Sequence, residues 1–366
     1  MPGIFFLVSD LGPCAAAKTL ALAVPALAKR YRVAVGVLGE AGGPFGATLV
    51  AAGFPPVAMP VRGLYDAGRV AAARQWVRSF EPDVLHAVGP AAVRLAPILG
   101  SQSPRRKPRP IVVSAADQPG GGLRGWWTRG FLRGTDQVIV ATQSEVDRYN
   151  RLGVPYDRIC VIPPGVPPTA PPPDPVEFRK ALDIPADGRL VIVVGGFDAT
   201  ADLLSAVWAF DVLRYTLPDV YLVLVGDGPD RDRTERFARS LAFDDHRVRF
   251  AGLRSDVPAL LALAEVVWVT HSRGGIHLAL EAMAAGRPVV AFDTPELSEV
   301  IEEEATGRLV APGNRVEMAA ATRELLADPD LAGRFGAAGK ARTAERHSVS
   351  GMTDQYALLY ERLLGG

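Results

Sequence analysis

Two adjacent glycines stand directly before an apolar helical stretch in the second half of the chain. The sequence reads Ser272-Arg273-Gly274-Gly275-Ile276 and continues into a helix that contains Glu281. Backbone amides in the first turn of such a helix, at 274–277, bind anions without the help of a lysine. Glu281 falls one to one and a half turns into the helix, where a carboxylate can accept hydrogen bonds from two ribose hydroxyls. The spacing predicts an anion site beside a sugar site.

Glycine turns also follow three other apolar runs. Gly226 begins a Gly-Asp-Gly-Pro turn, Gly252 is followed by Leu253 and Arg254, and Gly12 precedes a helix near the start of the chain. The tail of this first turn, Gly12-x4-Ala17-Lys18-Thr19, nearly matches the phosphate loop of NTPases, but Ala17 carries a Cβ where backbone amides must curl around phosphate. We reject the NTPase interpretation and keep the turn at Gly12 as a candidate anion or substrate contact.

A histidine and a basic aromatic segment are further candidates in the first half. Val84-Leu85-His86 places His86 at the expected end of a buried strand, either facing a ligand or serving the core. Arg124, Trp126, Trp127, Arg129, Phe131 and Arg133 interleave bases with aromatic rings shortly after a basic run at 105–109. This segment either docks on an anionic membrane or packs its tryptophans inward, and we favour the second alternative.

The elements that must position these residues alternate from end to end. Continuously apolar runs mark strands that are covered on both faces, and their alternation with helices marks parallel sheets. The expected strands are Ile4–Val8, Val33–Leu38, Val84–His86, Ile111–Ser114, Val138–Ala141, Ile159–Ile162, Leu190–Val194, Tyr221–Val225, Val248–Ala251, Val266–Thr270 and Val289–Phe292. The sequence predicts an α/β chain with two doubly wound domains.

Eight prolines from Pro163 to Pro175 interrupt this alternation and predict an extended linker. We expect a first domain over 1–165, a proline-rich linker over 166–186 and a second domain over 187–347. A last helix, over 348–366, is expected to return to the first domain. Ligands of open α/β sheets bind beyond the carboxyl ends of the strands, so we expect function in a cleft between the two domains.

Composition excludes several classes of protein. The chain has 366 residues, 48% of them hydrophobic and 22% charged, which excludes a disordered scaffold. Two cysteines exclude a disulfide framework and a zinc cluster, and no apolar run reaches the roughly 18 residues of a membrane span. We expect no secretion signal, because Asp10 interrupts the first apolar run.

The net charge of zero hides an asymmetry between the two halves. Residues 1–165 carry 19 Lys and Arg against 10 Asp and Glu, whereas residues 166–366 carry 21 against 30. The basic half either faces an anionic partner or attracts the acidic half across a cleft. We predict no nucleic-acid partner.

The order and spacing of the motifs resemble the retaining glycosyltransferases of family 4, which have the GT-B fold of two Rossmann-like domains facing each other across a cleft. The resemblance covers nearly the whole chain and rests on five segments. They are Pro82–His86, Thr135–Val140, Arg158–Val166, the Gly226-Asp227-Gly228-Pro229 turn and Glu281–Gly286.

The resemblance implies that a sugar is transferred from a nucleotide-diphosphate donor, held by the second domain, to a saccharide or lipid-linked acceptor. It implies a catalytic role for His86 and donor contacts from Gly12, Gly196, Gly226, Gly252, Leu253, Arg254, Arg273, Gly274, Gly275, Ile276 and Glu281. It also implies that the reaction needs no metal and no cofactor besides the nucleotide-sugar co-substrate. We expect a cytoplasmic protein, either free or attached to the surface of the inner membrane.

The departures from the family concern the chemistry of the donor site. Gly196 and Ala201 stand where the family usually has an arginine and a lysine that neutralise the diphosphate, and Arg273 replaces a glutamate that contacts the donor sugar. Arg273 is our candidate for a compensating cation. The alternative function is therefore a catalytically inactive family member that acts as a binding or partner protein. An epimerase or phosphorylase of the same fold is the less favoured third possibility.

Overall fold

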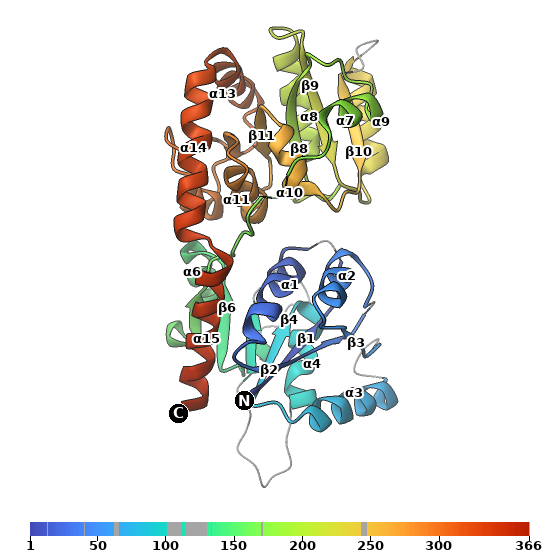
Figure 1. Ribbon diagram of the computed structural model, residues 1–366, viewed down its shortest axis with the longest axis vertical. Helices are drawn as coiled ribbons and strands as arrows, with labels where there is room; N and C mark the ends of the chain where they lie inside the picture. Colours follow the sequence, from blue (N-terminus) through green and yellow to red (C-terminus); the bar gives the residue numbers. More distant parts are fainter. Residues whose placement is uncertain are drawn as a thin grey trace. The chain divides into compact units, whose positions relative to one another are not determined.

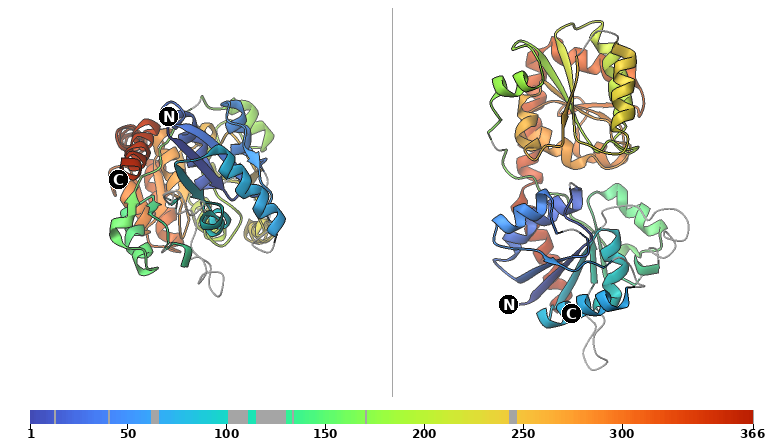
Figure 2. Two further views of the ribbon diagram at one scale, coloured as in Figure 1. Left: turned by 90° about the horizontal axis from the view of Figure 1, so that it is seen from below. Right: turned by 90° about the vertical axis from the view of Figure 1, so that its right-hand side faces the viewer.

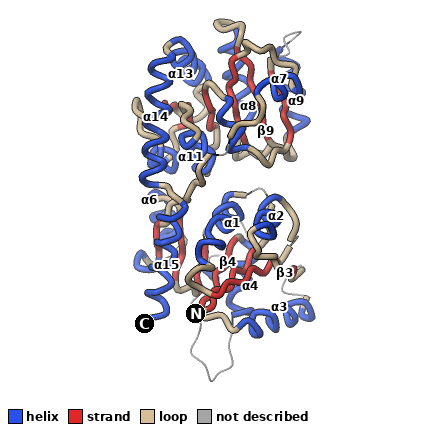
Figure 3. The backbone as a smooth tube through the Cα atoms, in the orientation of Figure 1, coloured by secondary structure: helices blue, strands red, loops and turns tan. Residues whose placement is uncertain are grey.

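The computed structural model describes residues 1–12, 14–39, 41–61, 66–100, 111–114, 130–132, 134–169, 171–242 and 247–365. The chain divides into two compact units. Unit 1 comprises Met1–Gly165 together with Val349–Gly366, and unit 2 comprises Val166–Ser348. Each unit is an α/β sandwich whose strands lie between helices (Figures 1 and 3).

Within the described residues, unit 1 contains a seven-stranded parallel sheet with the order β3-β2-β1-β4-β5-β6-β7. Its twist is visible in the right-hand view of Figure 2. The strands are β1 (Gly3–Val8), β2 (Arg32–Val37), β3 (Val57–Ala58), β4 (Val84–Val88), β5 (Ile111–Ser114), β6 (Gln137–Val140) and β7 (Ile159–Val161). The helices are α1 (Ala15–Leu27), α2 (Pro44–Ala51), α3 (Ala67–Phe80), α4 (Pro90–Gly100), α6 (Gln143–Arg151) and α15 (Val349–Gly365), with a 3-10 turn, η1 (Tyr156–Arg158).

The helices of unit 1 cover both faces of its sheet. Alternate residues of β1 point to opposite faces: Ile4, Phe6 and Val8 meet α1 and α15, whereas Phe5 and Leu7 meet α3 and α4. The C-terminal helix α15 packs against α1, and the Tyr31 hydroxyl donates a hydrogen bond to the carbonyl oxygen of Ala357 (3.2 Å). Because both faces are covered, all six residues of β1 are buried, which explains its continuously apolar sequence.

Unit 2 contains a six-stranded parallel sheet with the order β10-β9-β8-β11-β12-β13, the strand order of a Rossmann fold. The strands are β8 (Arg189–Val194), β9 (Val220–Val225), β10 (Val248–Gly252), β11 (Val266–Val269), β12 (Val289–Phe292) and β13 (Gly307–Val310). The helices are α7 (Pro175–Ala181), α8 (Leu203–Arg214), α9 (Arg231–Ala242), α10 (Val257–Leu260), α11 (Ile276–Ala284), α12 (Pro295–Val300), α13 (Arg315–Ala327) and α14 (Pro329–Arg346), with a 3-10 turn, η2 (Leu261–Leu263).

The core of unit 2 lies mainly between its sheet and helices α8, α13 and α14. Trp268 of β11 is completely buried there, and its indole N–H donates to the hydroxyl of Thr322 on α13 (2.7 Å). On the opposite side α11 packs against β11 and β12 and runs beside α14 (Figure 1). These contacts fix α11 to the sheet.

The predicted fold class, two doubly wound parallel sheets, is confirmed. The structure differs from the predicted elements in two details. The predicted linker over 166–186 includes a short helix, α7, because Asp174 accepts a hydrogen bond from the amide of Val176 and caps the helix. Strand β4 continues two residues past the predicted end, so His86 lies in its middle rather than at its carboxyl end.

Candidate functional site

The topological switch point of unit 2 lies between β8 and β11. These strands are neighbours in the sheet, but the chain leaves β8 toward α8 and β9 on one side and leaves β11 toward α11 and β12 on the other. In open α/β sheets the loops at such a point diverge and leave room for a ligand. The turns after β8 and β11 therefore form the candidate ligand site of this unit.

The turn after β11 leaves the amino terminus of α11 open. Gly274 and Gly275 have φ angles of +73° and +79°, which glycine adopts without strain. Gly275 is the N-cap of α11, and a glycine has no side chain that could accept a hydrogen bond from the first turn of the helix. The N-cap residue therefore places no carboxylate or hydroxyl at the positive end of the α11 dipole.

The turn after β8 is closed on itself by Asp198. Its Oδ1 accepts hydrogen bonds from the Thr200 amide (2.8 Å), the Thr200 hydroxyl (2.6 Å) and the Ala201 amide (3.2 Å). Burial opposes ionisation of this carboxyl group, but the hydrogen bonds outweigh it and hold the pKa of Asp198 below its usual value. Asp198 is therefore a fixed negative charge at the switch point.

The two turns are joined to each other. The hydroxyl of Thr270 donates to the carbonyl oxygen of Ala201 (2.6 Å), and the amide of Ser272 donates to the carbonyl oxygen of Thr200 (2.9 Å). His271, between Thr270 and Ser272, is thereby held against the turn after β8. A Cβ on Gly195 would lie 3.4 Å from Cε1 of His271 and 3.5 Å from its Nε2.

Arg273 and Glu281 differ in their exposure. Arg273 is exposed and forms no ion pair or hydrogen bond with a described residue. Glu281 is 4% exposed and is the sixth residue of α11, about 7.5 Å along the helix axis from its first residue. Its Cα–Cβ bond, like that of every residue in an α-helix, is tilted toward the amino terminus of α11.

The turns after β9 and β10 complete the same edge of the sheet. Gly226 has a φ of +132°, and a Cβ there would overlap the carbonyl oxygen of Gly195. The Gly226 amide donates to the carbonyl oxygen of Gly252 (2.9 Å). Gly195, Gly226 and Gly252 therefore bring the carboxyl ends of β8, β9 and β10 close together, and the predicted contact Gly196 follows Gly195 in the turn after β8.

Arg254, a predicted donor contact, is paired within its own turn. Its Nε and Nη2 donate to the two carboxylate oxygens of Asp256 (2.8 and 2.6 Å), and its guanidinium lies 5.9 Å from the centre of the Phe178 ring. The hydrogen bond with Arg254 is also the largest reason that the pKa of Asp256 is lowered. Leu253 beside it is 63% exposed. Arg254 therefore holds its turn in shape and brings little uncompensated charge.

Gly12 and His86 belong to unit 1, whereas the other predicted residues belong to unit 2. The amide of Gly12 donates to the carboxylate of Asp10 (3.1 Å) in the turn after β1. His86 is 1% exposed and lies in the core of unit 1, which favours the second of its two alternatives.

Both ring nitrogens of His86 are engaged by the core of unit 1. Nδ1 lies 2.6 Å from the hydroxyl of Tyr360 on α15, and Nε2 lies 2.7 Å from the hydroxyl of Ser114 on β5. Burial lowers the pKa of His86 to about 3, so the ring is neutral at physiological pH. The contacts join β4 and β5 to the C-terminal helix.

His271 was not among the predicted site residues. The signal that could have found it is the one applied to His86, a histidine at the carboxyl end of a buried strand, because His271 is two residues beyond β11. The predicted membrane segment cannot be compared in the same way. All of it except Phe131 lies outside the described residues.

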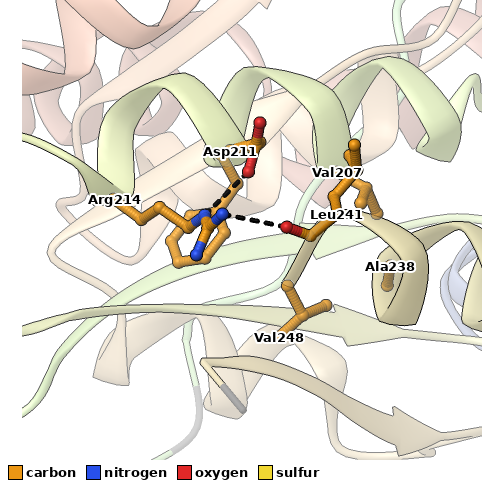
Figure 4. Close-up of a pocket in the computed structure, with 7 residues that line it drawn as sticks. Val207, Asp211, Arg214, Ala238, Leu241 and Val248 are labelled. Atoms are coloured by element: carbon orange, nitrogen blue, oxygen red, sulfur yellow. Dashed lines mark hydrogen bonds and ion pairs between the residues drawn. The ribbon is translucent and has the colours of Figure 1, made fainter. Parts of the chain in front are cut away.

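Other features of the described residues offer no second site. A small pocket between α8, α9 and β10 has mostly apolar walls. The guanidinium of Arg214 in this pocket pairs with the carboxylate of Asp211 (2.7 Å) and donates to the carbonyl oxygen of Leu241 (2.9 Å; Figure 4). Among the residues that the structure describes, no three His, Cys, Asp or Glu side chains gather as metal ligands would. No described helix is long and apolar enough to span a membrane.

Family models match both halves of the chain. Residues 16–170 match the model of "Glycosyltransferase Family 4", and residues 176–342 match that of "Glycosyl transferases group 1". The two matches lie on units 1 and 2 and meet near the boundary between them.

Curated relatives agree with the family models. The chain is 30% identical over 304 residues to phosphatidyl-myo-inositol mannosyltransferase of Mycolicibacterium smegmatis, which covers 80% of this chain and 74% of that protein. It is 31% identical over 191 residues to the lipopolysaccharide core biosynthesis glycosyltransferase LpsD of Rhizobium meliloti, which covers 52% of this chain and 54% of that protein. The alignments with several such relatives thus span only about half of their length.

Solved structures show the same architecture. The crystal structure of Anabaena HepE in complex with UDP-glucose superposes with a TM-score of 0.85 over 99% of this chain and 100% of that one, at 22% identity. With two Rossmann-type sheets in this order, matches to the models of both domains and a relative that aligns over most of its length, the chain belongs to the family 4 glycosyltransferases of the GT-B fold.

Proposed function

We propose that this chain is a metal-independent glycosyltransferase that moves a sugar from a nucleotide-diphosphate donor to a hydroxyl of a saccharide or lipid-linked acceptor. The bond between the anomeric carbon and the diphosphate oxygen breaks, and a bond to the acceptor oxygen forms. The acceptor proton is released and the nucleoside diphosphate leaves. The observation that carries the proposal is the amino terminus of α11 at the switch point of unit 2, where the N-cap is a glycine, with Glu281 on the same helix.

The geometry supplies what a diphosphate leaving group requires. Amides in the first turn of α11 stabilise the charge that develops as the diphosphate departs, and one such donor is typically worth 10²–10³ in rate. The exposed guanidinium of Arg273 adds a cation beside the same helix end. Glu281 holds the ribose through its two carboxylate oxygens.

Relatives support a donor and an acceptor class. HepE was crystallised with UDP-glucose, and the names of other relatives concern a lipopolysaccharide core and a phosphatidylinositol mannoside. These acceptors are saccharides carried on lipids. The basic residues 1–165, with 19 Lys and Arg against 10 Asp and Glu, suit an acceptor or membrane surface that bears negative charge.

We place the protein in the cytoplasm, at the inner surface of a membrane when its acceptor is lipid-linked. Co-sedimentation with vesicles of phosphatidylglycerol tests this location. Binding that falls when Trp126 and Trp127 are both replaced by alanine would assign the contact to this segment, binding that is unchanged would leave its tryptophans packed inward, and no sedimentation at low salt contradicts membrane attachment.

Calorimetric titration with UDP, GDP, ADP, UDP-glucose, GDP-mannose and ADP-glucose tests the donor site. We expect one nucleotide to bind, and we expect Glu281→Gln to weaken that binding at least tenfold because it loses the charge-assisted hydrogen bonds to the ribose. Arg273→Ala should weaken it about tenfold, which corresponds to roughly 1.4 kcal/mol. Arg323→Ala on α13, an exposed arginine of the same unit, is the matched control and should change nothing.

Release of nucleoside diphosphate from the bound sugar nucleotide then separates the enzyme from the inactive alternative. Slow hydrolysis, accelerated by a membrane extract that contains acceptors, supports the transferase. Binding without any turnover supports a binding protein that has kept the fold. If Arg273→Ala leaves donor affinity unchanged, Arg273 is not the compensating cation.

A further inference from the structure

His271 lies between the two glycine turns at the switch point of unit 2. On one side its ring is in contact range of Gly195, as described above. On the other, a Cβ on Gly275 would lie 3.0 Å from the Cβ of His271 and 3.2 Å from its Cγ. The absence of side chains at Gly195 and Gly275 leaves the space that the imidazole occupies. The ring therefore stands beside the open amino terminus of α11.

The hydrogen-bonding capacity of this imidazole is unused. Its Nδ1 is shielded from solvent and has no hydrogen-bond partner, and no described residue hydrogen-bonds to either ring nitrogen. A buried polar atom without a partner typically costs about 1–3 kcal/mol, and native proteins keep few of them. Nδ1 is thus available to accept from or donate to a bound ligand.

Burial leaves the ring of His271 neutral in the free protein, although a carboxylate lies near it. The titratable and charged groups on the surrounding elements are Asp198 in the turn after β8, Arg273 on the same loop, and His277 and Glu281 on α11. Burial lowers the pKa of His271 to about 4, although the carboxylate of Asp198 raises it. A second anion beside the ring would raise this pKa further, because it stabilises the imidazolium.

We propose that His271 contacts the diphosphate of the donor and takes up a proton when the donor binds, so that donor affinity depends on pH. The inference rests on the proposed function, since it needs a diphosphate at the amino terminus of α11. His271 then acts as a cation that exists only in the complex. In the free protein it adds no charge to the site.

The sign of the pH dependence follows from linkage. A group that binds its proton more tightly in the complex strengthens binding as the pH falls through its pKa in the complex, by at most tenfold per pH unit. We therefore expect the dissociation constant of the donor to be at least fivefold lower at pH 6 than at pH 8. Sugar nucleotides suit this measurement because their diphosphate diesters do not titrate in this range.

Titration calorimetry of the full chain in two buffers of different ionisation enthalpy measures the proton uptake directly. UDP-glucose, GDP-mannose and ADP-glucose serve as probes. We expect the tightest of them to bind with uptake of a substantial fraction of one proton at pH 6 to 7. His271→Gln should abolish the uptake and weaken binding at pH 6 to the value at pH 8. His271→Lys should restore affinity without the pH dependence, and Arg323→Gln should behave as the unaltered protein.

Each outcome decides between the two proposals. Tight binding with no proton uptake in the unaltered protein overturns the inference about His271 and leaves the proposed function standing. Uptake that persists in His271→Gln assigns the proton to another group and overturns it as well. Binding of none of the three probes at any pH overturns both. The measurement on the unaltered protein does not depend on whether a variant folds, and thermal unfolding checks each variant.

Discussion

In each sheet the fourth strand is followed by a helix at the switch point. The polar groups near this point have hydrogen-bond partners in unit 1 and lack them in unit 2. In unit 1 the hydroxyl of Ser9 accepts hydrogen bonds from the amides of Ala91 (3.0 Å) and Ala92 (3.2 Å) at the start of α4. His86 within β4 has partners for both nitrogens. In unit 2 the N-cap of α11 is Gly275, which has no side chain, and neither nitrogen of His271 hydrogen-bonds to a described residue.

The comparison distinguishes a polar group that builds a core from one that is available to a ligand. Satisfied buried groups fix the position of the elements that they join, here α15 on the sheet of unit 1. An unsatisfied polar group at a strand end destabilises the free protein, and a ligand that hydrogen-bonds to the group offsets this cost. A histidine within the fourth strand thus joins elements of unit 1, whereas the histidine just beyond the fourth strand of unit 2 keeps a ring nitrogen without a hydrogen-bond partner.

The largest expected effect is on the stability of unit 1. His86→Ala should lower the free energy of unfolding by about 3 kcal/mol, because it leaves a cavity and removes a partner from the buried hydroxyls of Tyr360 and Ser114. His271→Ala should cost about 1 kcal/mol or less, since no hydrogen bond is lost. Thermal unfolding, with hydrogen exchange at the amides of β4, measures both.

Trp76→Ala is the control for this measurement, because Trp76 is 52% exposed on α3 of the same unit and should change stability by less than about 0.5 kcal/mol. Donor affinity should be unchanged in His86→Ala. A variant that keeps its stability but loses turnover would restore the catalytic role that the resemblance implied for His86.

The next effect is acid destabilisation, which the two histidines share in the free protein. The pKa values of His86 and His271 are lowered to about 3 and about 4, below the roughly 6.5 of an unfolded chain. Between these values the unfolded chain binds more protons, so the stability that is present above pH 6.5 is lost as the pH falls. Each histidine should contribute about 1.5–2 kcal/mol of loss between pH 6.5 and 5.

Urea unfolding at several pH values measures this loss of stability, and variants of each histidine separate the contribution of His86 from that of His271. His86→Gln should reduce the dependence of the free energy of unfolding on pH in this interval, whether or not the donor is present. His271→Gln should reduce it only in the free protein, because the bound donor already favours the protonated ring. Equal curves for His271→Gln with and without donor would contradict a contact between His271 and the diphosphate.

Most of the fold could be predicted because continuous apolar runs separate buried strands from helices. The elements that escaped prediction have identifiable reasons. Helix α14 contains Gly333, Gly336 and Gly339, which read as helix breakers in a sequence. In the structure a Cβ on Gly336 would overlap the carbonyl oxygen of Gly286, so this glycine is needed where α14 packs closely against the end of α11.

The glycine turns of the site could be predicted because positive φ angles favour one residue type. His271 could not be placed so easily. Its position depends on hydrogen bonds from Thr270 and Ser272 to Ala201 and Thr200, about seventy residues earlier in the chain. The spacing of nearby residues in the sequence does not predict a contact between residues so far apart in the chain. The same limit explains His86, whose burial depends on Tyr360 at the other end of the sequence.

The smallest expected effect concerns the charge of Asp198. An asparagine can still accept hydrogen bonds from Thr200 and Ala201, so Asp198→Asn should keep the turn and remove only the negative charge. At pH 8, where His271 is neutral, the donor should then bind about threefold more tightly, because one anion no longer repels the diphosphate. At pH 6 the gain should disappear, since His271 has lost the carboxylate that favours its protonation.

Donor titrations at both pH values, with proton uptake recorded, measure this crossover. Asp211→Asn is the matched control, because that carboxylate pairs with Arg214 near the far end of α8 and should leave both values unchanged. Weaker binding at both pH values with unaltered proton uptake would mean that Asp198 serves only to shape its turn. A gain at pH 8 that shrinks at pH 6 would instead tie the charge of Asp198 to the proton on His271, and would separate the electrostatics of this switch point from the hydrogen-bonded core of unit 1.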